Sequence, residues 1–413
     1  MAGQEHAEVL AVSARGGEAR QLTAFAPAAR RLLADVERAV ARSRPECAAG
    51  ALVRALVAFA HERPDQARLV MGEALTGGAG LRDARDRLVD DLARMLERAR
   101  AELASSALVA DLPPSLLCGL TCRLLASRLR EHEPRLDGLA DELLAWLAVY
   151  ELPLAAHRWE ELAALPLPVR SPYLPPIALR APPSPLQGRT RMTRSARAEE
   201  RWLRVLFATV EVVARDGYAG ASVAAIAACA GIDTRAFYRT FASKQHALAA
   251  ANELLFRRAI ATAAGAFAAG ETWPARVWEA ARALTQCVED SRALAHVCLV
   301  ESQDGGAGML AGVEEIARAF AIFLYEGDAH RRERLGASAP DLPALAPDAI
   351  TTAVLELGYR RVRRRGEAAF TGLLAHAVFI ALAPFLGAEE AAERVRAAVH
   401  GADASAALAA SAA

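Results

Sequence analysis

Eight of the chain's prolines are concentrated in one short segment, between Pro166 and Pro185. Proline fixes the φ angle and has no backbone N–H group, so neither a helix nor an inner strand runs through such a segment. Proline at this density is typical of an extended, semi-rigid connection. We therefore expect a linker over residues 161–193, with a folded unit on each side of it.

The composition on both sides of this linker favours helices. The 413 residues are 54% hydrophobic but only 6% aromatic, and good helix formers dominate the chain. The sequence has no run of about 18 apolar residues, the length that spans a membrane, and its N-terminus does not resemble a secretory signal. We expect an all-α, cytoplasmic protein with no membrane association.

Charge and cysteine usage narrow the classes further. Lysine and arginine together number 49, as do aspartate and glutamate, so any surface that attracts nucleic acid must be local. Cys118 and Cys122 lie one helical turn apart but have no second pair of metal ligands nearby, and buried cysteine usually packs as a small apolar residue. We expect reduced thiols, no metal and no cofactor.

The two halves of the chain resemble each other. Residues 54–80 align without gaps with residues 282–308, and nine of the 27 positions are identical, including the Gly-Gly-Ala-Gly runs at 77–80 and 305–308. A phosphate-binding loop would need a following Lys-Ser/Thr pair, so we interpret these glycines as helix terminators. The similarity indicates a duplicated helical unit.

Each copy is followed by two apolar helical segments. The predicted segments are 114–131 and 136–150 in the first copy, and 348–365 and 367–383 in the second. The basic run Arg360–Arg365 ends one of them, where the helix dipole favours cations. Contact of this run with nucleic acid stays open as an alternative.

Three further helices are predicted directly after the linker. Apolar residues recur every three or four positions from 202 to 215 and indicate the first helix. Ser222 is placed to cap a second helix over 223–230. Gly231 favours a left-handed turn after it, and Asp233 is placed to cap the third helix.

The third helix has one polar and one aromatic face. With 100° per residue, a sector of about 140° holds hydroxyl, guanidinium and phenol groups that suit phosphates and base edges. These residues are Thr234, Arg235, Tyr238 and Arg239. Phe237 and Phe241 lie outside the sector and are predicted core residues. Two short helices joined by a tight turn, the second with such a face, indicate a helix-turn-helix.

The run GYAGASVAAIAACAGIDTRAFYRTFASKQHAL, residues 217–248, resembles the DNA-binding domain of TetR/AcrR-type transcriptional regulators. The resemblance implies a three-helix DNA-binding domain at 194–248 and a ligand-binding and dimerisation domain at 249–402. With the internal repeat, residues 1–160 then resemble a second helical bundle domain that lacks a helix-turn-helix. Residues 403–413 form an alanine-rich tail.

The resemblance also implies which side chains contact DNA. They are Ser222 and Val223 at the start of the second helix, Thr234 and Arg235 at base edges, Tyr238 and Lys244 at phosphates, and Arg239 and Thr240 at further positions. Arg194 and Arg197 belong to a basic arm, together with Arg189, Arg191, Arg201 and Arg204, that suits backbone or minor-groove contacts. Ala236 and Thr240 depart from the family pattern.

Members of this family generally pair through two C-terminal helices, for which 348–365 and 367–383 are the candidates here. A homodimer and an intrachain pseudo-dimer both remain possible. An apolar or weakly polar effector would be enclosed by helical-bundle aromatics. The candidates are Phe256, Phe267, Trp278, Phe320, Phe323, Tyr325 and Tyr359.

The leading hypothesis is therefore a ligand-responsive repressor that binds a double-stranded DNA operator. The alternative is a helical ligand-sensing or protein-binding adaptor that has lost useful DNA affinity. The sequence contains no nucleophile elbow, metal-spaced His/Cys set or dinucleotide loop, so we do not expect an enzyme.

Overall fold

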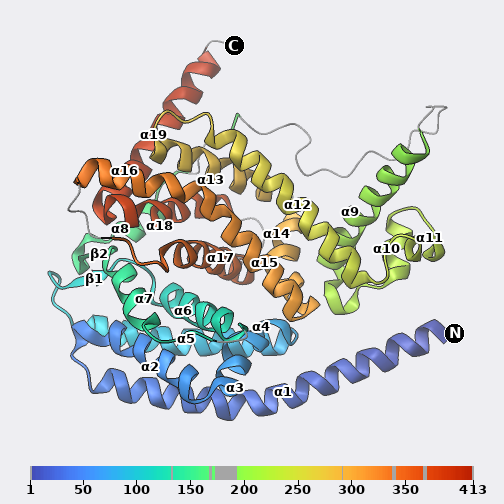
Figure 1. Cartoon of the computed structure of the whole chain (residues 1–413), viewed down its shortest axis with the longest axis horizontal. Coiled ribbons are helices and arrows are strands. Elements are labelled where there is room, and N and C mark those ends of the chain that lie inside the picture. The colour runs from blue at the N-terminus through green and yellow to red at the C-terminus, as the bar shows by residue number, and fades with distance from the viewer. Residues whose placement is uncertain are drawn as a thin grey trace.

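The structure, a computed structural model, describes residues 2–131, 134–166, 170–172, 193–290, 292–336, 341–365 and 370–411. Helices make up nearly all of this part of the chain (Figure 1), so the all-α prediction is confirmed. The exception is a short antiparallel pair of strands, β1 (Leu108–Ala110) and β2 (Glu151–Pro153), which sequence reasoning missed. Three residues per strand are too few for a detectable alternating pattern.

The first half of the chain forms the blue-to-teal part of Figure 1. Its helices are α1 (Ala2–Ala41), α2 (Ala48–Glu62), α3 (Pro64–Ala67), α4 (Ala74–Thr76), α5 (Ala79–Ala101), α6 (Pro114–Leu129), α7 (Leu139–Ala148) and α8 (Arg158–Ala163). Short helical turns complete it: η1 (Pro45–Cys47), the π-helical η2 (Arg68–Glu73) and η3 (Leu154–Ala156).

The second half begins with α9 (Arg194–Gly220), α10 (Val223–Cys229) and α11 (Thr234–Tyr238). A larger bundle follows. It consists of α12 (Lys244–Phe267), α13 (Trp273–Glu289), α14 (Arg292–Leu299), η4 (Glu301–Gly305), α15 (Ala307–Ala319), η5 (Phe320–Leu324), α16 (Tyr325–Leu335), α17 (Ala346–Arg365), η7 (Thr371–Leu373), α18 (Leu374–Leu386) and α19 (Ala388–Ser411).

The repeated glycine runs occupy equivalent places in the two halves. Gly78 precedes α5 with φ 100° and ψ 173°, and Gly306 precedes α15 with φ 92° and ψ 178°. Helix α4 ends just before the first run and η4 ends inside the second, so the glycines terminate helices as predicted. Positive φ at Gly78 and Gly306 explains why glycine recurs there.

The two halves pack against each other through equivalent helices. Helix α6 lies along α17, and each follows the Asp-Leu-Pro motif of its own half. One buried core cluster contains side chains of α1 to α8 together with side chains of α13, α17, α18 and α19. The Tyr150 hydroxyl, which is fully buried, donates to the Ile380 carbonyl oxygen at 2.8 Å. The halves therefore share one apolar core.

A buried ionic network joins α5 and α6 to α17. The Glu356 carboxylate, 0% exposed, accepts from Arg85 Nη1 at 2.9 Å and from Arg123 Nε at 3.0 Å. Burial by itself would raise the pKa of Glu356, but the charges of these two arginines outweigh it and lower the pKa to about 2. The carboxylate is therefore ionised inside the interface.

Two arginines of the basic run at the end of α17 pair with acidic residues of α5. Arg360 Nη2 lies 2.5 Å from Asp90 Oδ1, and Arg363 Nε lies 3.1 Å from Asp86 Oδ2. Arg363 also pairs with Asp83. These two arginines therefore bind the first half of the chain, which the sequence pattern alone did not indicate.

Several predicted boundaries differ from the structure. The helix predicted at 136–150 spans Leu139–Ala148, and the helix predicted at 367–383 is η7 followed by α18, which ends at Leu386. Helix α8 begins before the predicted linker and runs through its first three residues, whereas most of the proline segment falls outside the described residues. Helix α19 continues to Ser411 through most of the predicted tail.

Candidate DNA-binding interface and effector cavity

Side-chain caps begin the second and third helices after the linker, as the sequence predicted, whereas the first, predicted at 202–215, is the longer α9 (Arg194–Gly220). Ser222 Oγ accepts from the Ala225 amide at 3.1 Å and caps α10, and Asp233 Oδ1 accepts from the Ala236 amide at 2.6 Å and caps α11. Gly231 has φ 68°, the left-handed turn expected between them. The α9 chain bends at Gly217, where φ 70° and ψ 161° are not helical.

The two faces of α11 divide as its spacing predicts. Phe237 and Phe241 are 0% and 2% exposed and belong to the core of this unit. The opposite face is exposed and carries Thr234, Arg235, Tyr238, Arg239 and Thr240. Neither Arg235 nor Arg239 has a side-chain hydrogen bond or ion pair with any described residue. Their guanidinium groups are available to a polyanion.

Helix α11 ends at Tyr238, two residues before the end of the predicted recognition segment. The Thr240 amide then donates to the Phe237 carbonyl at 2.9 Å in a tight final turn. Tyr238 is 59% exposed, although its ring meets that of Phe237 edge-on at 5.6 Å. An exposed phenol braced in this way suits contact with a phosphate.

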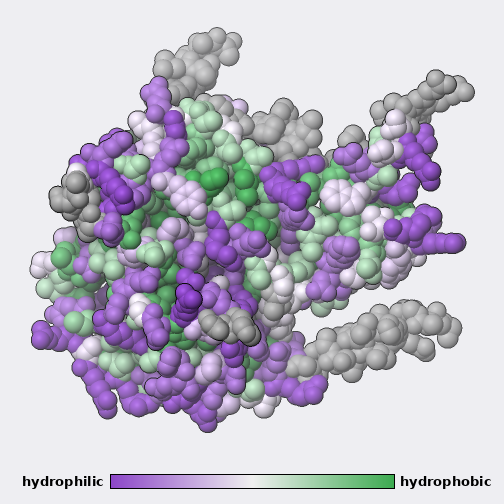
Figure 2. Space-filling model, in the orientation of Figure 1, coloured by the Kyte–Doolittle hydropathy of each residue, from purple (hydrophilic) through white to green (hydrophobic). Residues whose placement is uncertain are grey.

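Basic residues of α9 extend the polar surface. Arg194, Arg197 and Arg201 are exposed, and Thr193 Oγ1 caps the helix by accepting from the Ala196 amide at 3.1 Å. Figure 2 shows hydrophilic side chains over the outer end of this unit, near α9 and α11. The other predicted arm residues Arg189 and Arg191 lie outside the described residues.

Two of the predicted contact residues, Lys244 and Val223, lie against the inside of this unit. The Lys244 ammonium donates to the Tyr218 and Ala221 carbonyls at 2.7 and 2.9 Å and lies 4.6 Å from the centre of the Tyr218 ring. Burial lowers the pKa of Lys244. Val223 is half-buried against the core. Both hold the helix-turn-helix together, and their DNA contacts remain predictions.

The junction between the DNA-binding unit and the larger bundle was not foreseen from the sequence. Glu301 Oε2 accepts from the Tyr218 amide at 2.7 Å, next to the Gly217 bend. Its other oxygen lies 3.2 Å from His296 Nε2. Burial would raise the pKa of Glu301, but these hydrogen bonds and the nearby charge of Arg82 lower it. No local sequence signal marks such a long-range contact.

Further polar contacts fasten η4 on both sides. The Gln245 side chain donates to the Gly305 carbonyl at 2.7 Å, and Asn252 donates to Ser302 Oγ at 2.7 Å. Asp304 pairs with Arg82, which lies on α5 in the first half. The five residues of η4 therefore contact the DNA-binding unit and the first half of the chain.

An apolar cavity of about 230 Å³ lies inside the larger bundle, between α12, α13, α15, α17 and α18. Of the seven predicted wall aromatics, Phe256, Phe320 and Phe323 line it. The prediction is wrong for the other four. Trp278 and Tyr359 are buried outside the cavity, Phe267 packs against Phe323 at 5.1 Å, and Tyr325 is 70% exposed. Bundle aromatics pack in the core as readily as they line a pocket.

The polar groups in this cavity are already satisfied. Thr285 Oγ1 donates to the Ala281 carbonyl at 2.9 Å, and Thr351 Oγ1 donates to the Pro347 carbonyl at 3.0 Å. Burial raises the pKa of the Cys298 thiol to about 12, so it stays neutral. The cavity therefore offers a ligand little besides apolar contact.

Other candidate features do not form sites. Within the part of the chain that the structure describes, no group of three or more His, Cys, Asp or Glu side chains could hold a metal ion. Burial raises the pKa of both the Cys118 and Cys122 thiols. Across the same residues, no helix combines the length and apolar character needed to span a bilayer.

The capped helices, tight turn and exposed face define a helix-turn-helix DNA-binding protein. The family described as bacterial regulatory proteins, tetR family, matches residues 205–251, which run from α9 into α12. The chain is thus a DNA-binding transcriptional regulator that carries a TetR-family DNA-binding domain.

Two solved structures are similar to parts of the chain. One is the fatty acid degradation regulator FadR from Bacillus halodurans, at 19% identity and a TM-score of 0.39, covering 44% of this chain and 94% of that one. The other is the transcriptional regulator FadR from Bacillus subtilis in complex with stearoyl-CoA, at 16% identity and a TM-score of 0.39, covering 44% and 97%. No match was found among curated proteins.

Proposed function

We propose that the protein is a cytoplasmic, ligand-responsive repressor that binds its operator as a single chain through α11. The guanidinium groups of Arg235 and Arg239, which are exposed and have no partner among the described residues, are the observation that carries this proposal. They lie beside Tyr238 on a short helix braced from behind by Phe237. Such a face fits the major groove, where arginine reads guanine and a phenol contacts phosphate.

The packing of the two halves supports single-chain binding. In an isologous dimer, the same element of each copy meets at the interface. Here the equivalent helices α6 and α17 meet within one chain. The helix α17, which in family members would pair with a second subunit, is occupied by the first half. One chain then presents one helix-turn-helix to one operator half-site.

The course of α12 supports the response to a ligand. Its first turns belong to the core of the DNA-binding unit through Ala247, Leu248 and Ala251. Further along, Leu255, Phe256 and neighbouring residues line the apolar cavity. A ligand that binds one position of α12 better than another shifts the orientation of α11, because the same rigid helix contacts both.

Selection of bound genomic fragments identifies the operator, and variants then test the interface. Arg235→Ala should lower specific operator affinity roughly 10- to 100-fold, since a bidentate base contact contributes about 1–3 kcal/mol. Tyr238→Phe should weaken specific and non-specific binding alike, because phosphate contacts carry no sequence information. Arg87→Ala, an exposed arginine in the first half, is the matched control.

Unchanged operator binding in the Arg235→Ala, Tyr238→Phe double variant would contradict the assignment. Binding that appears only at low salt and has no sequence preference would instead support the adaptor alternative, which Ala236 and the absence of a helix-turn-helix from the first half motivate.

A further inference from the structure

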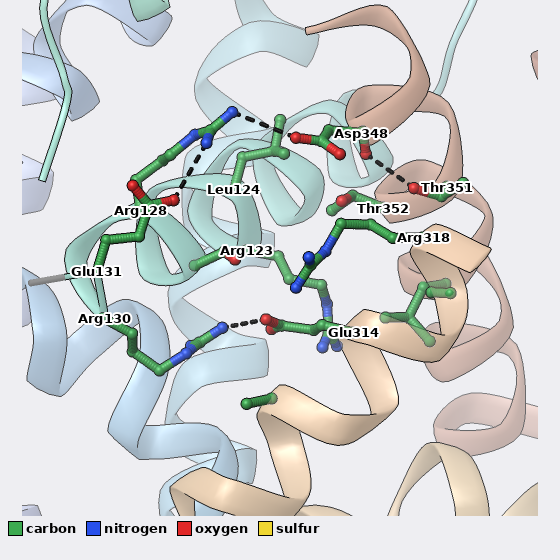
Figure 3. A pocket seen from close by; sticks show the side chains of 14 residues that line it. Arg123, Leu124, Arg128, Arg130, Glu131, Glu314, Arg318, Asp348, Thr351 and Thr352 are labelled. Atoms are coloured by element: carbon green, nitrogen blue, oxygen red, sulfur yellow. Dashed lines mark hydrogen bonds and ion pairs between the residues drawn. The ribbon is translucent and has the colours of Figure 1, made fainter. Parts of the chain in front are cut away.

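A second cavity, of about 300 Å³, lies between the two halves of the chain (Figure 3). Helix α6 and the residues after it form one side, and α15 and α17 form the other. Ala317, Thr351 and Leu355 line both this cavity and the apolar one. The two spaces therefore share part of their walls.

The interface cavity is rich in charged groups, with four arginines and three carboxylates along its walls. Each carboxylate has an arginine partner: Arg128 lies 3.1 Å from Glu131 and 3.2 Å from Asp348, and Arg130 pairs with Glu314. Arg130 Nη1 and Glu314 Oε1 have no further hydrogen-bond partner among the described residues. In Figure 3 the Arg128–Asp348 and Arg130–Glu314 pairs connect the two sides of the cavity. The remaining arginines are Arg123 and Arg318.

Arg123 and Arg318 keep unused donors. Arg318 is exposed, extends into the cavity toward Arg123 in Figure 3, and has no ion pair or side-chain hydrogen bond with a described residue. Arg123 is 1% exposed, and its Nε donates to Glu356. Its Nη1 and Nη2 atoms have no hydrogen-bond partner among the described residues. Buried guanidinium donors without partners are costly, so an anion that binds them is favoured.

The two cavities have complementary chemistry. One offers guanidinium groups, and the other offers an apolar wall with satisfied hydroxyls. Known small-molecule sites usually measure about 300–1,000 Å³. Each cavity alone lies at or below the lower end of that range, whereas the two joined past Ala317 fall inside it.

We propose that the two cavities form one site for an anionic amphiphile, with a carboxylate or phosphate head at Arg123 and Arg318 and an aliphatic chain in the apolar cavity. The proposal rests on the proposed ligand-responsive function and names the ligand class. Arg123 belongs to the first half and Arg318 to the second, so the head would bridge the halves. The aliphatic chain of the ligand would lie against α12, which leads to the helix-turn-helix.

Calorimetric titration of the full-length chain tests the ligand class. The probes are hexadecanoate, hexadecyl phosphate, hexadecanol and inorganic phosphate, and the first two distinguish the two sources of the charge. We expect an amphiphilic anion to bind with one-to-one stoichiometry and at least about tenfold more tightly than hexadecanol, because charge-assisted hydrogen bonds are strong. Inorganic phosphate should bind weakly, since it has no chain to bury.

Two pairs of variants test the geometry. Arg318→Ala should weaken binding of the preferred anion by about tenfold and leave hexadecanol binding unchanged, with Arg87→Ala as its control. Ala317→Phe should block passage between the cavities and abolish binding of both long-chain anions. Ala319→Phe, at an exposed position on the same helix that lines neither cavity, should not. Thermal unfolding of each variant shows that it is folded.

Equal binding of hexadecanoate, hexadecyl phosphate and hexadecanol, or an anion affinity unaffected by Arg318→Ala, would overturn the head-group site. Absence of binding by all three long-chain probes would overturn the joined site. Operator binding without ligand, measured on the same preparation, separates these failures from failure of the regulatory function. If the protein binds the operator but none of the amphiphiles, only the proposal of a joined amphiphile site is contradicted.

Discussion

At the scale of single residues, Gly119 shows how closely the two halves approach. A Cβ atom at this position would lie 2.3 Å from Glu356 Oε1, and the Gly119 carbonyl also accepts from Arg85 Nη2 at 3.3 Å. The buried carboxylate and its arginines leave no space for a methyl group. Glycine is required here by close contact, since no left-handed φ is involved.

Gly119→Ala should therefore destabilise the protein by about 1–3 kcal/mol, the usual cost of overpacking, and by more if the Arg85–Glu356 pair separates. Chemical denaturation measures the change. Gly265→Ala is the control, because it lies in α12 with nothing within 4 Å of the added Cβ and should gain up to about 1 kcal/mol of helix propensity. Equal stability of the two variants would refute the close packing at Gly119.

At the scale of elements, η4 is the contact that orients the DNA-binding unit. Its first residue, Glu301, accepts from the Tyr218 amide beside the Gly217 bend, and its fourth, Asp304, pairs with Arg82 of the first half. A residue with a side chain could not replace Gly217 without strain, because φ 70° there is a left-handed conformation. This bend and η4 lie at the contact between α9 and the bundle, where α9 also packs against α12 and α14.

The lowered pKa of Glu301 predicts an acid-sensitive junction. A carboxyl whose folded pKa is depressed contributes stability above its unfolded pKa, about 4.3, and loses it as pH falls through the folded value. Hydrogen exchange at the Tyr218 amide should therefore accelerate, relative to the intrinsic rate, as pH drops below about 4.3. In Glu301→Gln the protection should be weaker at neutral pH and should lack this transition. Identical profiles would show that Glu301 does not hold the junction.

At the scale of the whole molecule, the first half packs against α17 and α18 of the second half. The shared core, the Tyr150 to Ile380 hydrogen bond and the Glu356 network all lie at this contact. A buried network of this kind favours one pairing over others, because removing a partner leaves a charge unpaired in the interior.

The chain should therefore be monomeric in solution. Light scattering after size-exclusion chromatography should give the mass of one chain at micromolar concentration. Footprinting should show protection of one half-site, rather than two separated by about 34 Å as in a dimeric helix-turn-helix protein. A stable mass of two chains together with a palindromic footprint would contradict the single-chain arrangement.

The sequence by itself determined the helical class and the three helices of the DNA-binding domain, whereas the division of the chain at the proline segment stays a prediction. Their signals are local: Ser222, Gly231 and Asp233 act within a few residues of their own position, and the face of α11 follows from helical spacing. These local preferences act in whatever tertiary structure the chain adopts, so the sequence alone reveals them.

Only the tertiary structure decided how these elements are used. Arg85 and Glu356 are 271 positions apart, and nothing near either residue indicates the other. The same holds for the two arginines of α17 that pair with acidic residues of α5 and for Lys244, which donates to backbone carbonyls. It also holds for the two cavities whose walls share Ala317. Contacts between distant segments depend on how whole helices pack. The pairing of the two halves inside one chain results from that packing.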